Sequence, residues 1–263
     1  MTADISQTGS PRRVCVVTAG GQAPAIMINA LGAAFGPIDV VMEHPEPMWS
    51  FLKRRARKVG WTNLAGQFLT MVLIVQMKRL SRRSVRQIIR EEGLQIEIGA
   101  QHRMHNVVSV NSPDFIEKID ALGPEVIFLC GCRIVKPHIL GRVEVSVLNY
   151  HAGITPQYRG MNGGYWALAK GDVANFGATV HYVDAGVDTG PVVAQVRGTP
   201  VKGDAIWTYP LRQAAMSREM CIASVRALLD GTAKSIESSG SSAQHYHPEV
   251  WRYLWIGLTR GVW

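Results

Sequence analysis

The sequence has few cysteines and no pattern of them that would indicate zinc binding or a disulfide framework. The four cysteines, Cys15, Cys130, Cys132 and Cys221, include no repeated Cys-x-x-Cys pair, and three of them lie in apolar segments. Cysteines in such segments are usually buried and reduced. We therefore expect free thiols rather than disulfides or metal ligands.

The chain also lacks a leader-like start and a membrane-spanning run. Polar residues 1–11 lead directly into a strand-like segment at 13–17, without the charged-then-apolar order of a signal peptide. The apolar stretch 64–75 contains Gln67 and is shorter than the roughly 20 residues that a bilayer requires. We therefore expect a cytoplasmic protein, and a peripheral position at the inner membrane surface remains open.

Acidic residues are absent between Phe51 and Arg90, although the chain as a whole contains 28 Lys and Arg against 20 Asp and Glu, a net charge of +8. Eleven basic residues lie in this segment: Lys53, Arg54, Arg55, Arg57, Lys58, Lys78, Arg79, Arg82, Arg83, Arg86 and Arg90. Without these eleven, the remaining 17 basic residues would face 20 acidic ones. The whole basic excess therefore belongs to this one segment.

Residues 49–92 have a helical composition, with breaks expected at Gly60 and Gly66. We interpret them as a helical pair inserted into the first half of the domain. Three partners remain open for this insertion: the rest of the fold or a second copy in a homodimer, an anionic membrane surface, or a phosphate-bearing substrate. Nucleic acid is disfavoured, because no aromatic residues interleave with the basic ones.

Apolar strand-like runs alternate with helical segments over most of the chain. This order predicts an α/β, Rossmann-like, open and mostly parallel sheet with helices on both faces, plus the basic helical insertion and a C-terminal helical extension. We expect one main domain over 12–200. The extension, 201–263, would hold a long helix from about residue 205, a flexible Ser-rich linker at 235–244 and an aromatic-rich tail.

A glycine-rich turn follows the first strand, with Gly20, Gly21 and Gln22 at the start of a helix. Free backbone N–H groups in such a turn can hold a phosphate. A tight turn without a ligand is the alternative, and the residues leave both open.

Three polar residues are candidates for a catalytic centre. Asn149 and His151 end a buried strand two residues apart, so both side chains point to one side of the sheet. Asp188 lies on the loop between two later strands, and ligands of open parallel sheets bind beyond the carboxyl ends of the strands. Each residue taken alone could be structural. His181, on the strand before that loop, is expected to pack or hydrogen-bond locally.

The amino-acid sequence of these segments resembles that of the folate-dependent formyltransferases. The residues that carry the resemblance, strongest over 107–196, are Asn149-x-His151, the Pro156-Gln-Tyr-Arg159-Gly160 turn, the helix end from Trp166 to Asp172, and the Val183–Pro191 loop. By this resemblance, Asn149, His151 and Asp188 form the catalytic triad. Donors to the oxyanion would be the Asn149 amide and a His151 imidazolium, and Asp188 would hold His151 protonated or take the amine proton.

The resemblance also implies the ligands. The co-substrate would be N10-formyltetrahydrofolate without any metal, bound by the backbone of Arg133, Ile134 and Val135 and by Asp184. The acceptor would lie near the remaining candidates, namely Gly20, Gly21, Gln22, Arg159 and Gly160. Glycinamide ribonucleotide formyltransferases usually have Ser and Asn in the glycine loop, whereas this chain has Gln22-Ala23-Pro24.

We therefore expect an N-formyltransferase that acts on a small, anionic amine such as a nucleotide-linked amino sugar. Glycinamide ribonucleotide is the second candidate acceptor. Methionyl-tRNA is less favoured, because residues 200–263 are too few for the separate carboxyl-terminal barrel of those enzymes. A formyltetrahydrofolate hydrolase and a non-catalytic folate-binding protein remain as alternatives of other classes.

Overall fold

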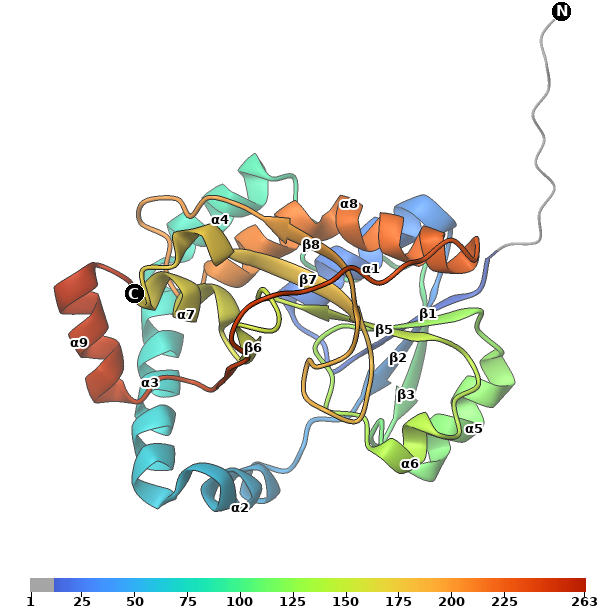
Figure 1. Cartoon of the computed structure of the whole chain (residues 1–263), viewed down its shortest axis with the longest axis horizontal. Helices are drawn as coiled ribbons and strands as arrows, with labels where there is room; N and C mark the ends of the chain where they lie inside the picture. Colours follow the sequence, from blue (N-terminus) through green and yellow to red (C-terminus); the bar gives the residue numbers. More distant parts are fainter. Residues whose placement is uncertain (1–11) are drawn as a thin grey trace, which may run out of the picture.

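The computed structural model describes residues 12–263 and contains one large sheet with helices around it (Figure 1). The sheet has seven strands in the order β3-β2-β1-β4-β5-β7-β8. Its strands are β1 (Val14–Thr18), β2 (Asp39–Glu43), β3 (Arg103–Val107), β4 (Val126–Leu129), β5 (Val147–His151), β7 (Gly177–Tyr182) and β8 (Val192–Arg197). The first five are parallel, and β7 and β8 are antiparallel to their neighbours. The predicted open, mostly parallel α/β sheet is confirmed.

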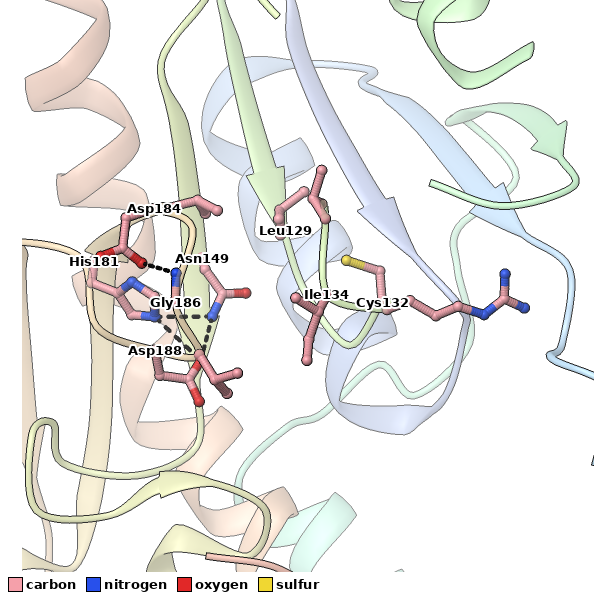
Figure 2. Close-up of a pocket in the computed structure, with 12 residues that line it drawn as sticks. Leu129, Cys132, Ile134, Asn149, His181, Asp184, Gly186 and Asp188 are labelled. Carbon is pink, nitrogen blue, oxygen red and sulfur yellow. Dashed lines mark hydrogen bonds and ion pairs between the residues drawn. The ribbon is translucent and has the colours of Figure 1, made fainter. Parts of the chain in front are cut away.

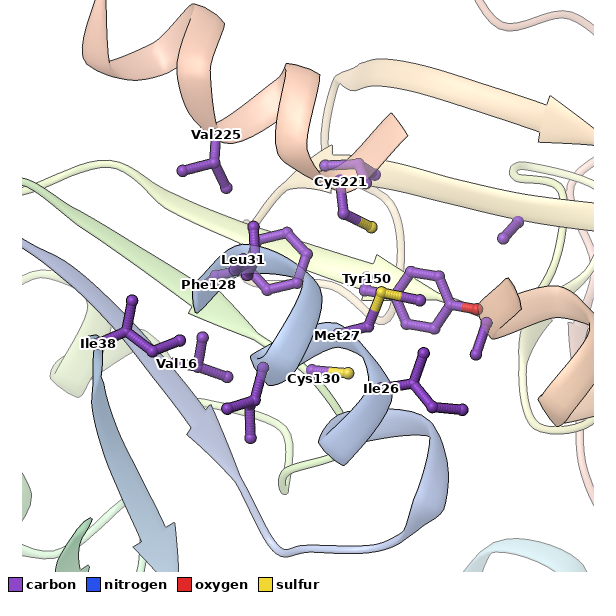
Figure 3. Packing of buried hydrophobic residues seen from close by; sticks show 14 of the residues in the cluster. Val16, Ile26, Met27, Leu31, Ile38, Phe128, Cys130, Tyr150, Cys221 and Val225 are labelled. Carbon is purple, nitrogen blue, oxygen red and sulfur yellow. The ribbon is translucent and has the colours of Figure 1, made fainter. Parts of the chain in front are cut away.

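Helices cover both faces of the sheet, as expected for parallel strands that are buried on both sides. The helices are α1 (Gln22–Phe35), α2 (Met48–Val59), α3 (Trp61–Leu80), α4 (Arg82–Glu91), α5 (Pro113–Leu122), α6 (Pro137–Leu140), α7 (Gly163–Ala169), α8 (Tyr209–Leu229) and α9 (Val250–Arg260), with a 3₁₀ turn at Val173–Asn175. On one face Met27 and Leu31 of α1 pack with Val225 of α8 and Phe128 of β4 (Figure 3). Helix α5 covers the other face through Phe115 and neighbouring apolar residues.

The order of the strands reverses between β1 and β4. The chain leaves β1 toward β2 and β3 on one side, then returns to place β4 and β5 on the other. Ligands of such sheets bind at this reversal, beyond the carboxyl ends of the strands. The loops that follow β1 and β4 meet here, because the Ala19 N–H donates to the Gly131 carbonyl at 3.0 Å.

The insertion contains three helices, so the expected helical pair is wrong in number. The break at Gly60 is present between α2 and α3. Gly66, however, lies inside α3. A glycine is needed at this position because the indole of Trp251 from α9 occupies the space that a side chain would fill. The glycine allows α9 to approach α3 closely and does not end the helix. No helix in residues 12–263 has the length and apolar character needed to cross a membrane.

The carboxyl-terminal part also differs from expectation. Helix α8 begins at Tyr209 rather than near residue 205, since a turn that Thr208 closes with Ala205 precedes it. The Ser-rich residues 235–244 are not a free linker, because the Ile236 N–H donates to the Val192 carbonyl. The segment ends in β9 (Gln244–His245), which pairs with β6 (Arg159–Gly160).

Candidate active site

The three residues of the predicted triad come together at the ends of β5 and β7. Asn149 and His151 lie at the end of β5, and Asp188 follows β7 on the loop to β8. The Asn149 amide nitrogen donates to Asp188 Oδ1 at 3.3 Å, and His151 Nδ1 lies 3.5 Å from Asp188 Oδ2. One carboxylate therefore contacts both other members of the triad.

Asp188 is held as a carboxylate by its neighbours. Burial raises its pKa, but the charge of His151 and the backbone N–H of Gly160, which donates at 2.8 Å, favour the carboxylate, and the pKa is lowered to about 2. Its backbone is left-handed, with φ of 51°, a conformation that non-glycine residues seldom adopt. The loop therefore places the carboxylate at some conformational cost.

Both ring nitrogens of His151 face acceptor oxygens. Nδ1 faces Asp188, and Nε2 lies 2.7 Å from the Tyr158 carbonyl oxygen. An imidazolium, which donates from both nitrogens, satisfies this arrangement. The side chain is buried and is not among the residues that line the pocket, so in this structure it contacts Asp188 and the Tyr158 backbone rather than open space.

His181 belongs to the same cluster: it hydrogen-bonds locally, as expected, and it also contacts two of the triad residues. Its Nε2 lies 3.0 Å from the Asn149 amide nitrogen and 3.5 Å from Asp188 Oδ1, while Nδ1 lies 2.7 Å from the Tyr182 carbonyl oxygen. The neutral tautomer that donates from Nδ1 lets Nε2 accept from Asn149. The signal that could have found it is the pairing of β7 with β5, which places His181 directly opposite Asn149.

A pocket opens beside this cluster (Figure 2). Asn149, His181 and Asp188 lie on one side, and Leu129, Cys132 and Ile134 from the end of β4 lie on the other. The remaining lining residues are Arg133, Val135, Val183, Asp184, Gly186 and Val187. The pocket therefore has an apolar wall facing a polar one.

The predicted folate-binding loop lines this pocket, but part of its backbone is already engaged. The Arg133 N–H donates to the buried carboxylate of Glu43 at 2.5 Å, and the Arg133 guanidinium pairs with the same carboxylate at 3.1 Å. The Ile134 carbonyl accepts from Asn111 at 2.9 Å. A ligand in the pocket would therefore meet the exposed Ile134 side chain and Val135, whereas Arg133 anchors the loop.

Asp184, the fourth predicted cofactor residue, lines the pocket and also braces its own loop. Its carboxylate accepts from the Gly186 N–H at 3.0 Å and from the Thr189 hydroxyl at 2.7 Å. These bonds shape the turn that carries Asp188.

The predicted acceptor-binding residues fall into two groups. Arg159 and Gly160 contact the Asp188 loop, since the Arg159 guanidinium donates to the Val187 carbonyl at 2.7 Å and Gly160 donates to Asp188. Gly20 and Gly21 form the turn before α1 with positive φ values of 87° and 116°.

Gln22, the other residue of the second group, accepts from Lys78 at the end of α3 at 2.9 Å. A cation of the insertion therefore stands at the amino end of α1, where backbone N–H groups point outward.

The cluster is suited to hydrogen bonding and proton transfer. The one pocket-lining cysteine, Cys132, has a pKa raised by burial, so it remains a thiol and is a poor nucleophile. Within residues 12–263, no group of three or more His, Cys, Asp or Glu side chains is arranged to hold a metal ion. An amide donor beside a buried carboxylate and two imidazoles can stabilise an oxyanion and move a proton.

Residues 70–219 match the family model described as formyl transferase. A methionyl-tRNA formyltransferase of Chlorobium luteolum is 31% identical over 173 residues, which are 64% of this chain and 54% of the relative. A phosphoribosylglycinamide formyltransferase of Mycobacterium tuberculosis is 40% identical over 106 residues, which are 40% of this chain and 49% of the relative. The chain thus spans about half the length of these curated relatives.

The fold also matches solved structures. A sugar N-formyltransferase from a Shewanella species has a TM-score of 0.55 at 14% identity, with 89% of this chain and 76% of that chain covered. At this identity the likeness concerns the fold alone. The names of these three relatives refer to three different acceptors.

Proposed function

Because the chain belongs to the formyl transferase family, we propose that it transfers the formyl group of N10-formyltetrahydrofolate to a primary amine of a small, anionic acceptor. A nucleotide-linked amino sugar is the acceptor that we favour. The observation that carries the proposal is the contact of Asn149 and His151 with one buried carboxylate, Asp188, at the edge of a pocket lined by the loop after β4.

Asn149 supplies the hydrogen-bond donor for the transition state. Attack of an amine on a formyl carbon places negative charge on the formyl oxygen. The Asn149 amide can donate to that oxygen once one of its two N–H groups turns away from Asp188. Removing one such donor typically lowers kcat by about 10²–10³-fold. The second histidine, His181, accepts from the same amide and so fixes the direction in which it points.

Asp188 acts mainly through its charge. A carboxylate with a pKa of about 2 is a weak base at neutral pH, so its role is to orient the His151 ring, whose Nδ1 lies 3.5 Å from Asp188 Oδ2. The proton that leaves the attacking amine must reach the departing nitrogen of the folate. Asp188 and a water molecule in the pocket can relay it without any net change in the protein.

The amino end of α1 supports an anionic acceptor. Gly21 is exposed at the start of α1, whereas the Gly20 N–H already donates to the Thr18 hydroxyl, and Lys78 adds a positive charge beside Gln22. Both a sugar nucleotide and glycinamide ribonucleotide carry phosphate, so the ribonucleotide is the second candidate. Hydrolysis of the formylated folate, with water in place of the amine, would use the same cluster.

We place this reaction in the cytoplasm, with residues 12–200 as the catalytic domain and 201–263 as its extension. The free folate donor and nucleotide-linked sugars are soluble anions, and the N–H groups and cations described above suit them. A homodimer is compatible with this function.

Mass spectrometry can test the proposal directly. Purified protein is incubated with N10-formyltetrahydrofolate and either a panel of nucleotide-linked amino sugars, glycinamide ribonucleotide or no acceptor, with Asp188→Asn as the inactive control. A formylated sugar made only by the wild type supports the proposal. Formylation of the ribonucleotide alone would move the assignment to the second candidate, and formate released without acceptor would indicate a hydrolase.

A further inference from the structure

Helix α3 has apolar side chains on two opposite faces, and only one of them is covered by the protein. The inner face is buried at Gly66 and Thr70, and Leu73 and Ile74 pack against a core cluster formed by α7, α9 and their neighbours. The other face, called the outer face below, carries exposed apolar residues. They are Trp61, Phe68, Leu69, Val72 and Val75, followed by Leu80 at the helix end.

The spacing of these residues shows that they form a single stripe. At about 100° per residue, positions 61, 68, 69, 72 and 75 all fall on one side of the helix. Large contiguous apolar surfaces of this kind mark contact sites in soluble proteins. Figure 1 shows α2, α3 and α9 at one end of the molecule, outside the sheet and the helices that cover it.

Exposed indole rings are present on α2, α3 and α9. Trp49 at the start of α2 and Trp61 at the junction of α2 and α3 are 61% and 63% exposed. On α9, Trp251, Leu254, Trp255 and Leu258 are exposed at the i, i+3, i+4, i+7 spacing of a second apolar stripe. Indoles are enriched where hydrocarbon meets water at a membrane surface.

Basic residues flank the outer face in the sequence, and most of them form no ion pair with an acidic side chain within residues 12–263. Before it lie Lys53, Arg57 and Lys58 of α2, and after it lie Arg79, Arg82, Arg83, Arg86 and Arg90. Of the eleven basic residues between Phe51 and Arg90, only Arg54 forms an ion pair in the described part of the chain, with Glu46. The partner of this end must therefore be both apolar and anionic.

An anionic lipid surface meets both requirements, and we propose that α2, α3 and α4, with α9 beside them, dock on one. The outer face of α3 would enter the boundary between headgroups and acyl chains, with the arginines of α2 and α4 on the lipid phosphates. A second copy of the chain fits less well, because a twofold contact through this face would oppose two sets of like charges. Nucleic acid fits less well, because the aliphatic side chains between the two basic groups would meet phosphate.

Vesicle flotation tests the proposal with the whole chain. The vesicles are phosphatidylcholine alone and an equal mixture of phosphatidylcholine and phosphatidylglycerol, at low and high salt. We expect binding to the mixed vesicles at low salt, little binding to phosphatidylcholine, and weakening as salt rises. Absence of binding to the anionic vesicles at low salt would overturn the proposal.

Two sets of variants locate the contact. Leu69→Gln with Val72→Gln removes apolar side chains from the outer face while keeping good helix formers, and should weaken binding about tenfold or more. Arg82→Glu with Arg83→Glu and Arg86→Glu should weaken it more than about a hundredfold. Matched controls are Val173→Gln, also about half exposed, and Arg142→Glu, both far along the chain from the insertion. Thermal melting verifies that each variant is folded.

The outcomes separate the possible occupants. Equal vesicle binding by wild type and folded outer-face variant would overturn the proposal, because the contact would lie elsewhere. So would a wild-type dimer that the Leu69→Gln/Val72→Gln variant dissociates without any vesicle binding, since a second copy would then cover the face. Retention of transfer RNA by the basic residues, with no affinity for vesicles, would assign the surface to nucleic acid instead.

Discussion

The backbone N–H of Gly160 donates to Asp188 Oδ2 at 2.8 Å, and this bond joins the Arg159–Gly160 strand to the loop that carries the Asp188 carboxylate. Gly160 has φ of 90°, and a side chain there would collide with the carbonyl oxygen of His245. The position thus requires glycine both for its backbone and for its surroundings.

Gly160→Ala should therefore disturb the site as well as the fold. We expect a loss of about 1–3 kcal/mol in the free energy of unfolding, from the strained backbone and the displaced β9 strand. Formyl transfer should fall more than stability explains, because the added methyl group must push the backbone away from His245 and so move the residue-160 N–H relative to Asp188. Chemical denaturation and kcat/KM are the measurements.

Gly171→Ala is the matched control, since Gly171 has a similar φ of 77° with nothing within 4 Å of an added side chain. It should share the backbone strain and keep its activity. Equal activities for the two folded variants would contradict the role given to Gly160.

Asp188→Asn should abolish most activity and also change the response to acid. The pKa of Asp188 lies below its usual 3.8, at about 2, so its ionised form stabilises the folded state. This stabilisation is fully present above about pH 4 and is lost as the pH falls toward 2. The difference in melting temperature between wild type and Asp188→Asn should therefore narrow across that range, and a constant difference would show that the charge is not the cause.

His181 should contribute to catalysis through Asn149. Replacing it by Phe leaves the Asn149 amide with Asp188 but without its second acceptor, and we expect kcat to fall about 10–10²-fold while KM for the folate changes little. His181→Gln keeps an acceptor near the same place and should recover part of the rate. If His181→Phe and wild type have equal kcat, the imidazole plays no part in orienting the amide.

Glu43 should anchor the loop that carries Ile134 and Val135. Its buried carboxylate accepts from the backbone of Arg133 and pairs with the Arg133 guanidinium, so Glu43→Ala leaves a partly buried charge unpaired. Loss of one partner of such a pair costs about 3–5 kcal/mol. Urea denaturation measures this loss, and calorimetry with tetrahydrofolate should show weaker binding.

Glu46→Ala provides the comparison for Glu43. Its carboxylate pairs with the exposed Arg54, and surface pairs contribute about 0–1 kcal/mol. Similar stability losses for Glu43→Ala and Glu46→Ala would contradict the anchoring role.

Lys78→Ala should weaken binding of an acceptor that carries phosphate. We expect KM for the acceptor to rise about 5–10-fold, because one cation at a helix start is removed, while KM for the folate stays constant. Lys53→Ala, which removes a charge from α2, is the control. A rise in both KM values would indicate a general disturbance rather than an acceptor contact.

The strands and the triad could be predicted from the sequence because their signals are local. Apolar runs of four to six residues mark buried strands, and Asn149 and His151 alternate at the end of one. The role of His181 depends on the antiparallel pairing of β7 with β5, which the residues of β7 alone do not specify. The glycine at position 66 is explained by packing with a distant residue, because the Trp251 indole of α9 leaves no space for a side chain there. The sequence around Gly66 does not show this contact.

The pairing of β6 with β9 makes the site depend on a segment that is distant in the sequence. Gly160, which donates to Asp188, pairs with His245 of β9 and is covered by its backbone. Proteolytic cleavage in the Ser-rich residues before β9 would therefore release the strand that covers Gly160, although Asn149 and His151 would stay in place on β5.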